Sequence, residues 1–147
     1  MKIEFEIPGE PQGKGRPRFS SIAGHVRART PDKTVLYENL VKTAYVAAAD
    51  GKTFSGDAML RMSIIAWFSM PKSASRKRLE DMRCCNVRPT KKPDIDNIAK
   101  VVADSLNGIA YRDDAQIVGM TVGKYYNDTP KVTVIIEDYT AETYGMC

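Results

Sequence analysis

Alternating apolar and charged residues open the chain. Residues 2–7 carry isoleucine or phenylalanine at every second position, with charged side chains between them, and this period of two predicts a half-buried β-strand. Residues 8–18 are dense in glycine and proline and predict a loop. Residues 58–70 predict a longer strand, and Ile65 and Trp67 on its second face predict core packing on both sides of its second half. The first face of that strand carries Leu60, Met62, Ile64, Ala66 and Phe68.

Helical periodicity follows the first loop. The pattern runs to about Asp50, where Gly51 predicts the stop, and Thr30 or Asp32 is predicted to cap its start. The residues predicted to face the core share one side of the helix. They are Leu36, Tyr37, Leu40, Val41, Ala44 and Ala48.

The second half of the chain predicts a short basic helix over residues 73–83 and strands over residues 116–126 and 131–138. Asn127-Asp-Thr-Pro130 separates the two strands, and this spacing predicts a β-hairpin. With a further helix described below, the order is β-α-β-α-α-β-β. We therefore expect a single α/β domain over residues 1–147, with a small mixed β-sheet flanked by helices.

The further helix follows Pro93, with Asp96 or Asn97 as its predicted N-cap and Asn107-Gly108 as its stop. A buried stripe and a polar stripe each recur at intervals of three or four residues. The buried stripe is Ile98, Val101, Val102, Ser105, Leu106 and Ile109, and the polar stripe is Asp96, Lys100, Asp104 and Asn107. Helix geometry thus aligns two carboxylates and one ammonium on the face away from the core.

More acidic residues lie near this stripe in the sequence. Asp94 is two residues before Asp96, and an extended backbone between them would point both side chains the same way. A turn further on could fold Asp113 or Asp114 back toward this pair. Each feature also has a purely structural interpretation, as a helix cap, a surface ion-pair row or a turn.

Basic residues are concentrated in two segments. The formal net charge is +4 and the pI is about 9.0. Residues 71–92 hold eight basic side chains against two acidic ones, and residues 11–31 hold five basic side chains and no acidic one. Such clusters attract a phosphate backbone, although solvated loops would have the same composition. The basic residues predicted to contact nucleic acid are Lys14, Arg16, Arg18, Lys72, Arg76, Lys77, Arg78, Lys91 and Lys92.

Soft metal ligands are scarce. His25 is the only histidine, and Cys84, Cys85 and Cys147 are the only cysteines, so a zinc site of the usual kind is not expected. A metal here should be a hard cation held by oxygen, as Mg²⁺ is at many sites of phosphodiester cleavage. Cys84 and Cys85 are interpreted as inert thiols in a loop, and His25 as a phosphate or solvent contact.

No segment resembles a signal peptide or a membrane span. The longest apolar stretches, such as residues 63–70, are far too short to cross a bilayer. We therefore expect a cytoplasmic protein.

The stretch from Lys92 to Val118, with Asp94-Ile-Asp96-Asn97 near its start, resembles the signature of the RusA family of Holliday junction resolvases. The opening loop from Gly13 to Arg18 is also similar to that of many members, and the resemblance covers most of the chain. It implies a RusA-like fold and a crossover junction endodeoxyribonuclease, a phosphodiester hydrolase that resolves four-way junctions in DNA recombination and repair.

The resemblance also implies roles for individual residues. Three aspartates of the family coordinate Mg²⁺, and they match Asp94, Asp96 and Asp114, with Mn²⁺ as a substitute metal. A lysine needed for cleavage matches Lys100. Asp104 is expected to position that lysine. The residues expected to support the site from outside the ligand set are Asn97, Asp104 and Asp113, the last of which could also be a turn residue.

Family members are homodimers that nick paired strands of a junction symmetrically, and many are encoded by phages or prophages. The resemblance therefore implies a homodimer acting on branched DNA. Two other functions stay open at this point. One is a related nuclease for flaps or replication forks, and the other is a non-catalytic protein of the same fold that binds branched DNA.

Overall fold

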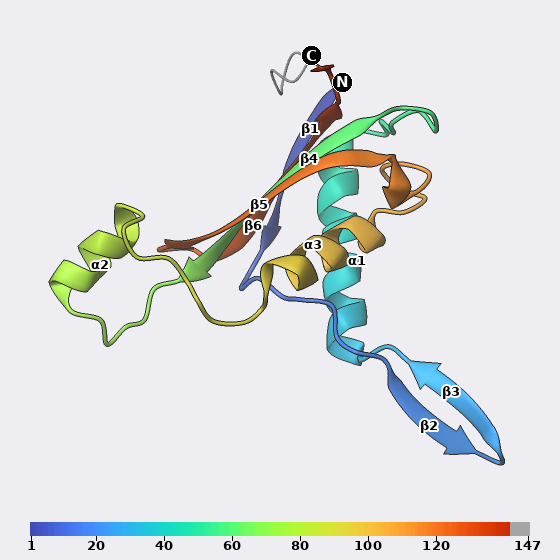
Figure 1. Cartoon of the computed structure of the whole chain (residues 1–147), viewed down its shortest axis with the longest axis horizontal. Helices are drawn as coiled ribbons and strands as arrows, with labels where there is room; N and C mark the ends of the chain where they lie inside the picture. The colour runs from blue at the N-terminus through green and yellow to red at the C-terminus, as the bar shows by residue number, and fades with distance from the viewer. Residues whose placement is uncertain (142–147) are drawn as a thin grey trace.

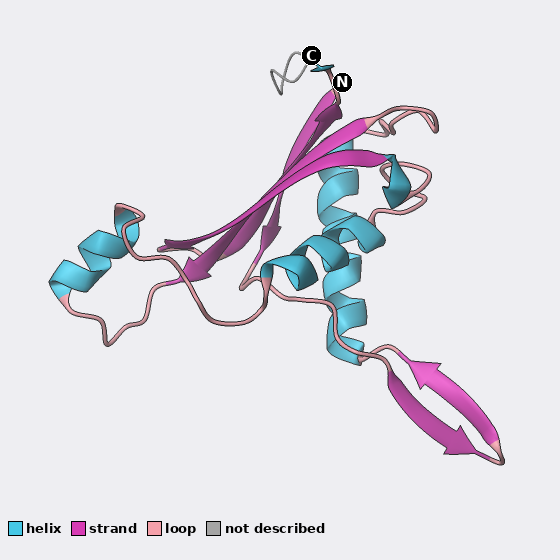
Figure 2. Cartoon of the chain, in the orientation of Figure 1, coloured by secondary structure: helices cyan, strands magenta, loops and turns pink. Residues whose placement is uncertain are grey.

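The computed structural model describes residues 1–141. Its main sheet is formed by β1 (Lys2–Pro8), β4 (Leu60–Ser69), β5 (Ile117–Asn127) and β6 (Lys131–Asp138), in the order β1-β6-β4-β5. β6 pairs antiparallel with β1 and with β4, whereas β4 pairs parallel with β5. The sheet is therefore mixed, as expected (Figures 1 and 2).

Three helices accompany the sheet: α1 (Asp32–Ala49), α2 (Arg76–Arg83) and α3 (Ile95–Ser105). α1 packs against β1 and α3, and α3 also contacts β5, so these two helices cover the sheet together. α2 lies near β5 at one end of the molecule (Figure 1). The expected mixed sheet flanked by helices is confirmed.

The core forms between the sheet and the pair α1 and α3. Along β4 the side chains alternate strictly between buried and half-buried, so the predicted core face of this strand is confirmed. Trp67 on the second face is half-buried. Its indole N–H donates to Thr133 Oγ1 at 3.1 Å, and its ring lies 5.4 Å from that of Tyr125. The second half of β4 is thus partly covered on this face by side chains of neighbouring strands.

The prediction of a β5–β6 hairpin is wrong. β4 lies between the two strands and pairs with both of them. The short polar connection between β5 and β6 in the sequence gives no sign that another strand lies between them in the sheet. β4 occupies the centre because its buried face is continuously apolar and both of its edges then find hydrogen-bond partners.

The cap predicted for α1 is also wrong. Pro31 holds the N-cap position and makes no side-chain cap hydrogen bond. The buried side of the helix is only partly as predicted, because Leu36 is 70% exposed and Ala48 is exposed. The residues that are buried are Thr34, Tyr37, Val41, Tyr45 and Ala49. Apolar residues surround this helix on several sides, so the sequence pattern alone did not select the face that meets the sheet.

A second sheet was not predicted. β2 (Arg18–Ile22) and β3 (His25–Arg29) form an antiparallel hairpin that projects from the body of the molecule, and we call residues 18–29 the arm (Figure 1). Ala23 and Gly24 at its tip both have positive φ, 51° and 76°. Positive φ at both central residues is the geometry of a type I′ turn, which fits the twist of a hairpin.

The basic helix predicted over residues 73–83 is confirmed as α2, which begins at Arg76 behind the N-cap Ser75. Cys84 and Cys85 follow it as exposed free thiols, while Cys147 lies outside the described residues. Among residues 1–141 there is no helix with the length and apolar content needed to span a membrane.

Candidate active site

Asp94 is the N-cap of α3, so the predicted cap, Asp96 or Asn97, is wrong by two or three residues. The first backbone hydrogen bond runs from Ile98 N–H to the Asp94 carbonyl at 3.1 Å, so Asp96 already lies in the first helical turn. A capping aspartate normally accepts a hydrogen bond from the helix backbone, but the Asp94 side chain makes none. The Asp94 carboxylate therefore stays available to a ligand at the positive end of the helix dipole.

The two stripes predicted for α3 are found in the structure. Most of the apolar stripe is fully buried, whereas Asp96 and Lys100 are exposed and Asp104 is half-buried. Helix geometry places the side chains of Asp96, Lys100 and Asp104 along one face. α3 therefore presents a row of acidic, basic and acidic groups beside a fully packed core.

The second acidic pair folds back onto the far end of this row. The Asp114 side chain lies against that of Asp104, and Asp113 is close by. Partial burial, together with the neighbouring Asp104 and Asp113 carboxylates, raises the pKa of Asp114 above its usual range. A bound cation would reduce the repulsion between these neighbouring carboxylates.

Asp113 is used to build the turn. Its carboxylate accepts from the Ala115 N–H at 2.8 Å, and the Gln116 side chain accepts from the Asp113 N–H at 3.3 Å, which together make a capping box. Gln116 also donates to the carbonyl of Ser55 at 2.8 Å and so ties the turn to the loop before β4. Its role in the turn therefore accounts for Asp113. The Asp114 carboxylate is not part of the capping box.

Tyr111 anchors the same turn to α3. Its buried hydroxyl donates to the Ala103 carbonyl at 2.7 Å. Burial, followed by the carboxylates of Asp114, Asp104 and Asp113, raises the pKa of Tyr111 far above its usual range. The phenol therefore stays protonated and keeps donating this hydrogen bond.

The carboxylates lie in two groups at the two ends of α3, with Lys100 between them. Asp94 and Asp96 are at the N-terminal end, and a rise of about 1.5 Å per residue puts Asp104 about 12 Å further along the axis than Asp96. Asp114 lies in the second group. Among residues 1–141, no three acidic, histidine or cysteine side chains are gathered to hold a metal ion. The assignment of Asp94, Asp96 and Asp114 as ligands of one or two metal ions stays a prediction.

The opening loop contributes a cation to the second group. Lys14 Nζ forms an ion pair with Asp104, and Lys14 N–H donates to the Asn97 carbonyl at 3.4 Å. The Gly15 N–H donates to Thr34 Oγ1 at 3.0 Å, and a Cβ at Gly15 would stand only 2.5 Å from that oxygen. The ion pair of Asp104 in the structure is therefore with Lys14 and not with Lys100, the lysine that Asp104 is predicted to position.

Two basic grooves flank the opening loop. One, of about 440 Å³, carries the cations Lys14, Arg16 and Lys100. The other, of about 560 Å³, carries Lys14, Arg18, Lys33 and Lys92, and no acidic side chain lines either groove. A groove lined by several cations and by no acidic side chain suits a phosphate backbone. Lys33 was not among the predicted DNA contacts, because its position at the start of a helix does not show that it faces the loop.

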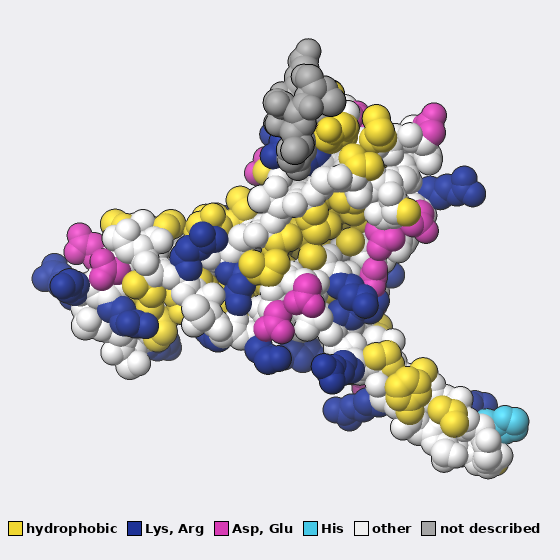
Figure 3. Space-filling model, in the orientation of Figure 1, with side chains coloured by type: hydrophobic (Ala, Val, Ile, Leu, Met, Phe, Trp, Pro, Cys, Tyr) yellow, Lys and Arg dark blue, Asp and Glu magenta, His cyan; other side chains and the backbone are white. Residues whose placement is uncertain are grey.

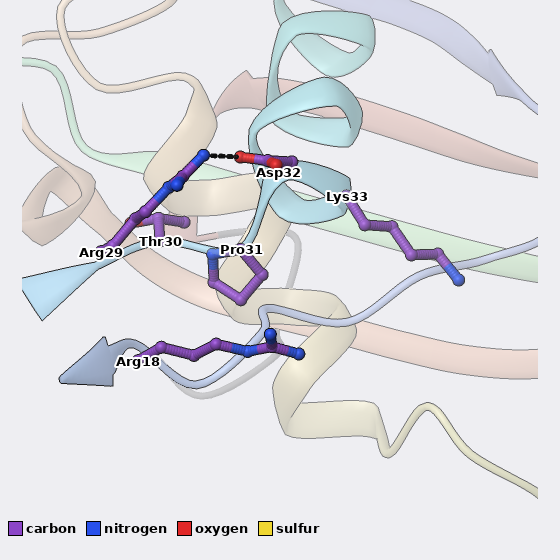
Figure 4. A pocket seen from close by; sticks show the side chains of 6 residues that line it. All are labelled: Arg18, Arg29, Thr30, Pro31, Asp32 and Lys33. Atoms are coloured by element: carbon purple, nitrogen blue, oxygen red, sulfur yellow. Dashed lines mark hydrogen bonds and ion pairs between the residues drawn. The ribbon is translucent and has the colours of Figure 1, made fainter. Parts of the chain in front are cut away.

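A smaller hollow of about 320 Å³ lies where the arm meets α1. It is lined by Arg18, Arg29, Pro31, Asp32 and other residues. Figure 4 shows that Asp32 is joined to Arg29, and the two groups are 2.8 Å apart. Arg18 lies on the other side of Pro31. The base of the arm is therefore also basic.

The other predicted DNA contacts lie elsewhere on the surface. Lys72, Arg76, Lys77 and Arg78 are exposed on or near α2, at the opposite end of the molecule from the arm (Figure 1). Lys91 and Lys92 are exposed in the loop that leads to α3. Lys92 Nζ is 3.7 Å from the Asp94 carboxylate. In Figure 3, acidic side chains near α3 are flanked by Lys and Arg on the face shown.

The motif at the head of α3 and the loop attached to it lie within a region that matches a known family. The family model described as "Endodeoxyribonuclease RusA" matches residues 8–137. The chain belongs to the RusA family. Membership of this family implies endodeoxyribonuclease activity, and the family acts on branched DNA junctions. The chain is also similar to the "Uncharacterized protein YqaN" of Bacillus subtilis (strain 168), with 38% identity over 141 residues, which is 95% of this chain and 98% of that protein.

Proposed function

We propose that this protein is a Mg²⁺-dependent, structure-selective endonuclease that resolves four-way DNA junctions by paired nicking, and that it serves DNA recombination and repair in the cytoplasm. One observation carries the proposal. Within a RusA-family chain, the Asp94 carboxylate at the head of α3 is not spent on capping and lies next to grooves lined by basic side chains. Carboxylates beside phosphate-binding cations are the combination that metal-assisted phosphodiester hydrolysis needs.

The available donors fit Mg²⁺ in their chemistry. Asp94, Asp96 and Asp114 would hold one or two Mg²⁺ ions through carboxylate oxygens, which hard cations prefer. The raised pKa of Asp114 marks a place where negative charge is poorly compensated. When bound, Mg²⁺ supplies an activated water and neutralises charge on the phosphate, and Mn²⁺ can take its place.

The other residues of the site bind and orient the DNA. Lys100 projects from the exposed face of α3 between the two acidic groups, where its ammonium would stabilise negative charge on the scissile phosphate. The groove cations Lys14, Arg16 and Arg18 would hold the neighbouring phosphates. Lys91, Lys92 and the basic residues of α2 would extend this contact along the DNA.

Paired nicking requires two active sites on one junction. Only one such set of acidic residues is found in the described part of the chain, on α3 and the turn after it. We therefore propose that the protein acts as a homodimer. Light scattering of the purified protein should give twice the mass of one chain, and a monomer at the concentrations that support cleavage would contradict this.

The decisive experiment compares Asp94→Asn and Asp114→Asn on a synthetic four-way junction. Each variant should lose Mg²⁺-dependent nicking while junction binding is kept or strengthened, because the change removes a metal ligand and one negative charge. The matched control is Asp50→Asn. Asp50 is exposed at the end of α1 in the left-handed conformation that asparagine also tolerates. Cleavage by either site variant at the wild-type rate would refute the ligand assignment.

The same assay separates the proposed function from its alternatives. Flap and replication-fork substrates are offered in competition with the four-way junction. Faster cleavage of a flap or a fork than of the junction would identify that structure as the substrate in place of the junction. Tight binding of branched DNA without cleavage in Mg²⁺ or Mn²⁺ would identify a non-catalytic binding protein.

A further inference from the structure

The two faces of the arm differ in chemistry. Residues that are directly opposed in an antiparallel pair share a face, and the register pairs Arg18 with Arg29 and Phe19 with Ala28. One face therefore carries Arg18, Ser20, Ile22, His25, Arg27 and Arg29, and the other carries Phe19, Ser21, Val26 and Ala28. The arm is thus a ribbon with a basic face and a mainly apolar face.

All ten residues of β2 and β3 are exposed. Phe19 and Val26 on the apolar face are each 72% exposed. An isolated two-stranded hairpin is only marginally stable in water, and an aromatic ring held in solvent adds nothing to its stability. Both facts point to a partner that covers the arm.

The position of the arm relates it to α3. Its base continues directly into the opening loop, where Gly13 lies so close to α3 that a Cβ would stand 2.9 Å from Cβ of Asn97. Lys14 then pairs with Asp104, and Gly15 is bound to Thr34 of α1. On the face seen in Figure 3, hydrophobic side chains of the arm and acidic side chains near α3 are visible together. A molecule gripped by the arm is therefore held next to the acidic helix.

Charge identifies the occupant as a polyanion. The basic face has three arginines and the arm has no acidic residue, and five residues per strand at about 3.3 Å each give a reach of about 17 Å. Phosphates account for the basic face, but they do not account for the exposed phenylalanine. Unstacked bases do, because every base has a face on which an aromatic ring can stack.

We infer that the arm inserts at the branch point of a DNA junction, with its basic face along a phosphate strand and Phe19 stacked on a base exposed at the crossover. Linear duplex DNA offers the phosphates but covers its base faces by stacking, so only branched DNA satisfies both faces of the arm. The inference rests on the proposed function and adds to it a determinant of substrate choice: the arm favours junctions over duplexes.

The test measures binding of a four-way junction and of a linear duplex of the same sequence in EDTA, where no cleavage occurs. Phe19→Ala should weaken junction binding about tenfold, as expected for the loss of one base–aromatic stack, and should leave duplex binding unchanged. Phe19→Trp should retain junction binding. The control is Val46→Ala on α1, which also truncates an exposed apolar residue (59% exposed) and should change neither affinity.

The basic face gives the opposite pattern. Arg27→Gln should weaken junction and duplex binding alike and should lower the salt dependence by about one phosphate contact. A junction with 2-aminopurine at the crossover reports the stack directly, since its fluorescence should be quenched by wild type and by Phe19→Trp and not by Phe19→Ala.

The outcomes separate the arm from the active site. If wild type and Phe19→Ala prefer the junction equally, the inference about the arm is overturned and the proposed function stands. If wild type shows no preference for branched DNA, junction resolution fails and the role of the arm fails with it. If Phe19→Ala instead converts a dimer into a monomer, a second copy of the chain covers the apolar face and the inference is overturned.

Discussion

Replacing Lys14 by methionine removes the cation that faces Asp104 while it keeps the length and apolar character of the side chain. The Lys14 and Asp104 side chains are 30% and 25% exposed. The exposure of this ion pair is therefore intermediate. Exposed pairs contribute less than about 1 kcal/mol to the free energy of unfolding, whereas breaking a buried pair costs about 3–5 kcal/mol. We expect a loss of about 1–2 kcal/mol at neutral pH, which lowers Tm by about 3–6 °C for a chain of this size.

The loss should depend on pH in a defined direction. The pKa of Asp114 is raised in the folded protein by burial and by Asp104. A group with a raised folded pKa contributes stability that is present at low pH and is lost as the pH rises through that pKa. Removing Lys14 leaves the Asp104 carboxylate without its paired cation, beside Asp114. Lys14→Met should therefore approach wild-type stability in mildly acidic, metal-free buffer, and added Mg²⁺ should recover part of the loss at neutral pH.

The assay is thermal unfolding followed by circular dichroism between pH 4 and 8, with EDTA or with Mg²⁺. Lys131→Met is the matched control, because Lys131 pairs with Glu6 at 2.6 Å with similar lysine exposure, and both residues lie in the sheet, on β6 and β1. That variant should lose about 1 kcal/mol or less, with no response to Mg²⁺. Equal losses in the two variants at every pH, with no effect of Mg²⁺ on either, would refute the electrostatic link between the opening loop and the acidic group.

Three further predictions follow from single residues. Tyr111→Phe should cost about 1 kcal/mol, or about 3 °C in Tm, because one buried hydrogen bond to Ala103 is lost while that carbonyl keeps a second partner; an unchanged Tm would contradict this. Ala23→Asn should stabilise the turn of the arm by about 0.5–1 kcal/mol, since φ is +51° there, and slower amide hydrogen exchange across the arm would show it. Burial raises the pKa of Tyr37 to about 12, so its contribution to stability is present below pH 10 and is lost between pH 10 and 12. In Tyr37→Phe, Tm should therefore fall less steeply with pH above pH 10 than in wild type.

The strands β1 and β4 and the two stripes of α3 could be read from the sequence because they depend on local periodicity. A side chain at every second position of β4, or at every third or fourth position of α3, has its direction set by the backbone itself. The prediction of oxygen ligands for a metal also rests on the sequence alone, because the chain has few cysteines, one histidine and several closely spaced aspartates.

Contacts between distant segments were decided by the tertiary structure. The short connection between β5 and β6 predicted a hairpin, but β4 enters between them because its two edges need partners. Nothing in the local pattern marked Lys14 as the partner of Asp104, ninety residues away. The choice of Asp114 came from the family motif, and the structure explains why Asp113 differs: its carboxylate closes a capping box.

The secondary structure of β1, β4 and α3 and the family motif follow from the sequence alone, because they depend on residues that are neighbours along the chain. The tertiary structure decided the order of the strands, the face of α1 that is buried, the projection of the arm and the grouping of Asp104, Asp114 and Lys14. These features depend on which segments fill space together, and packing of that kind is a property of the whole chain.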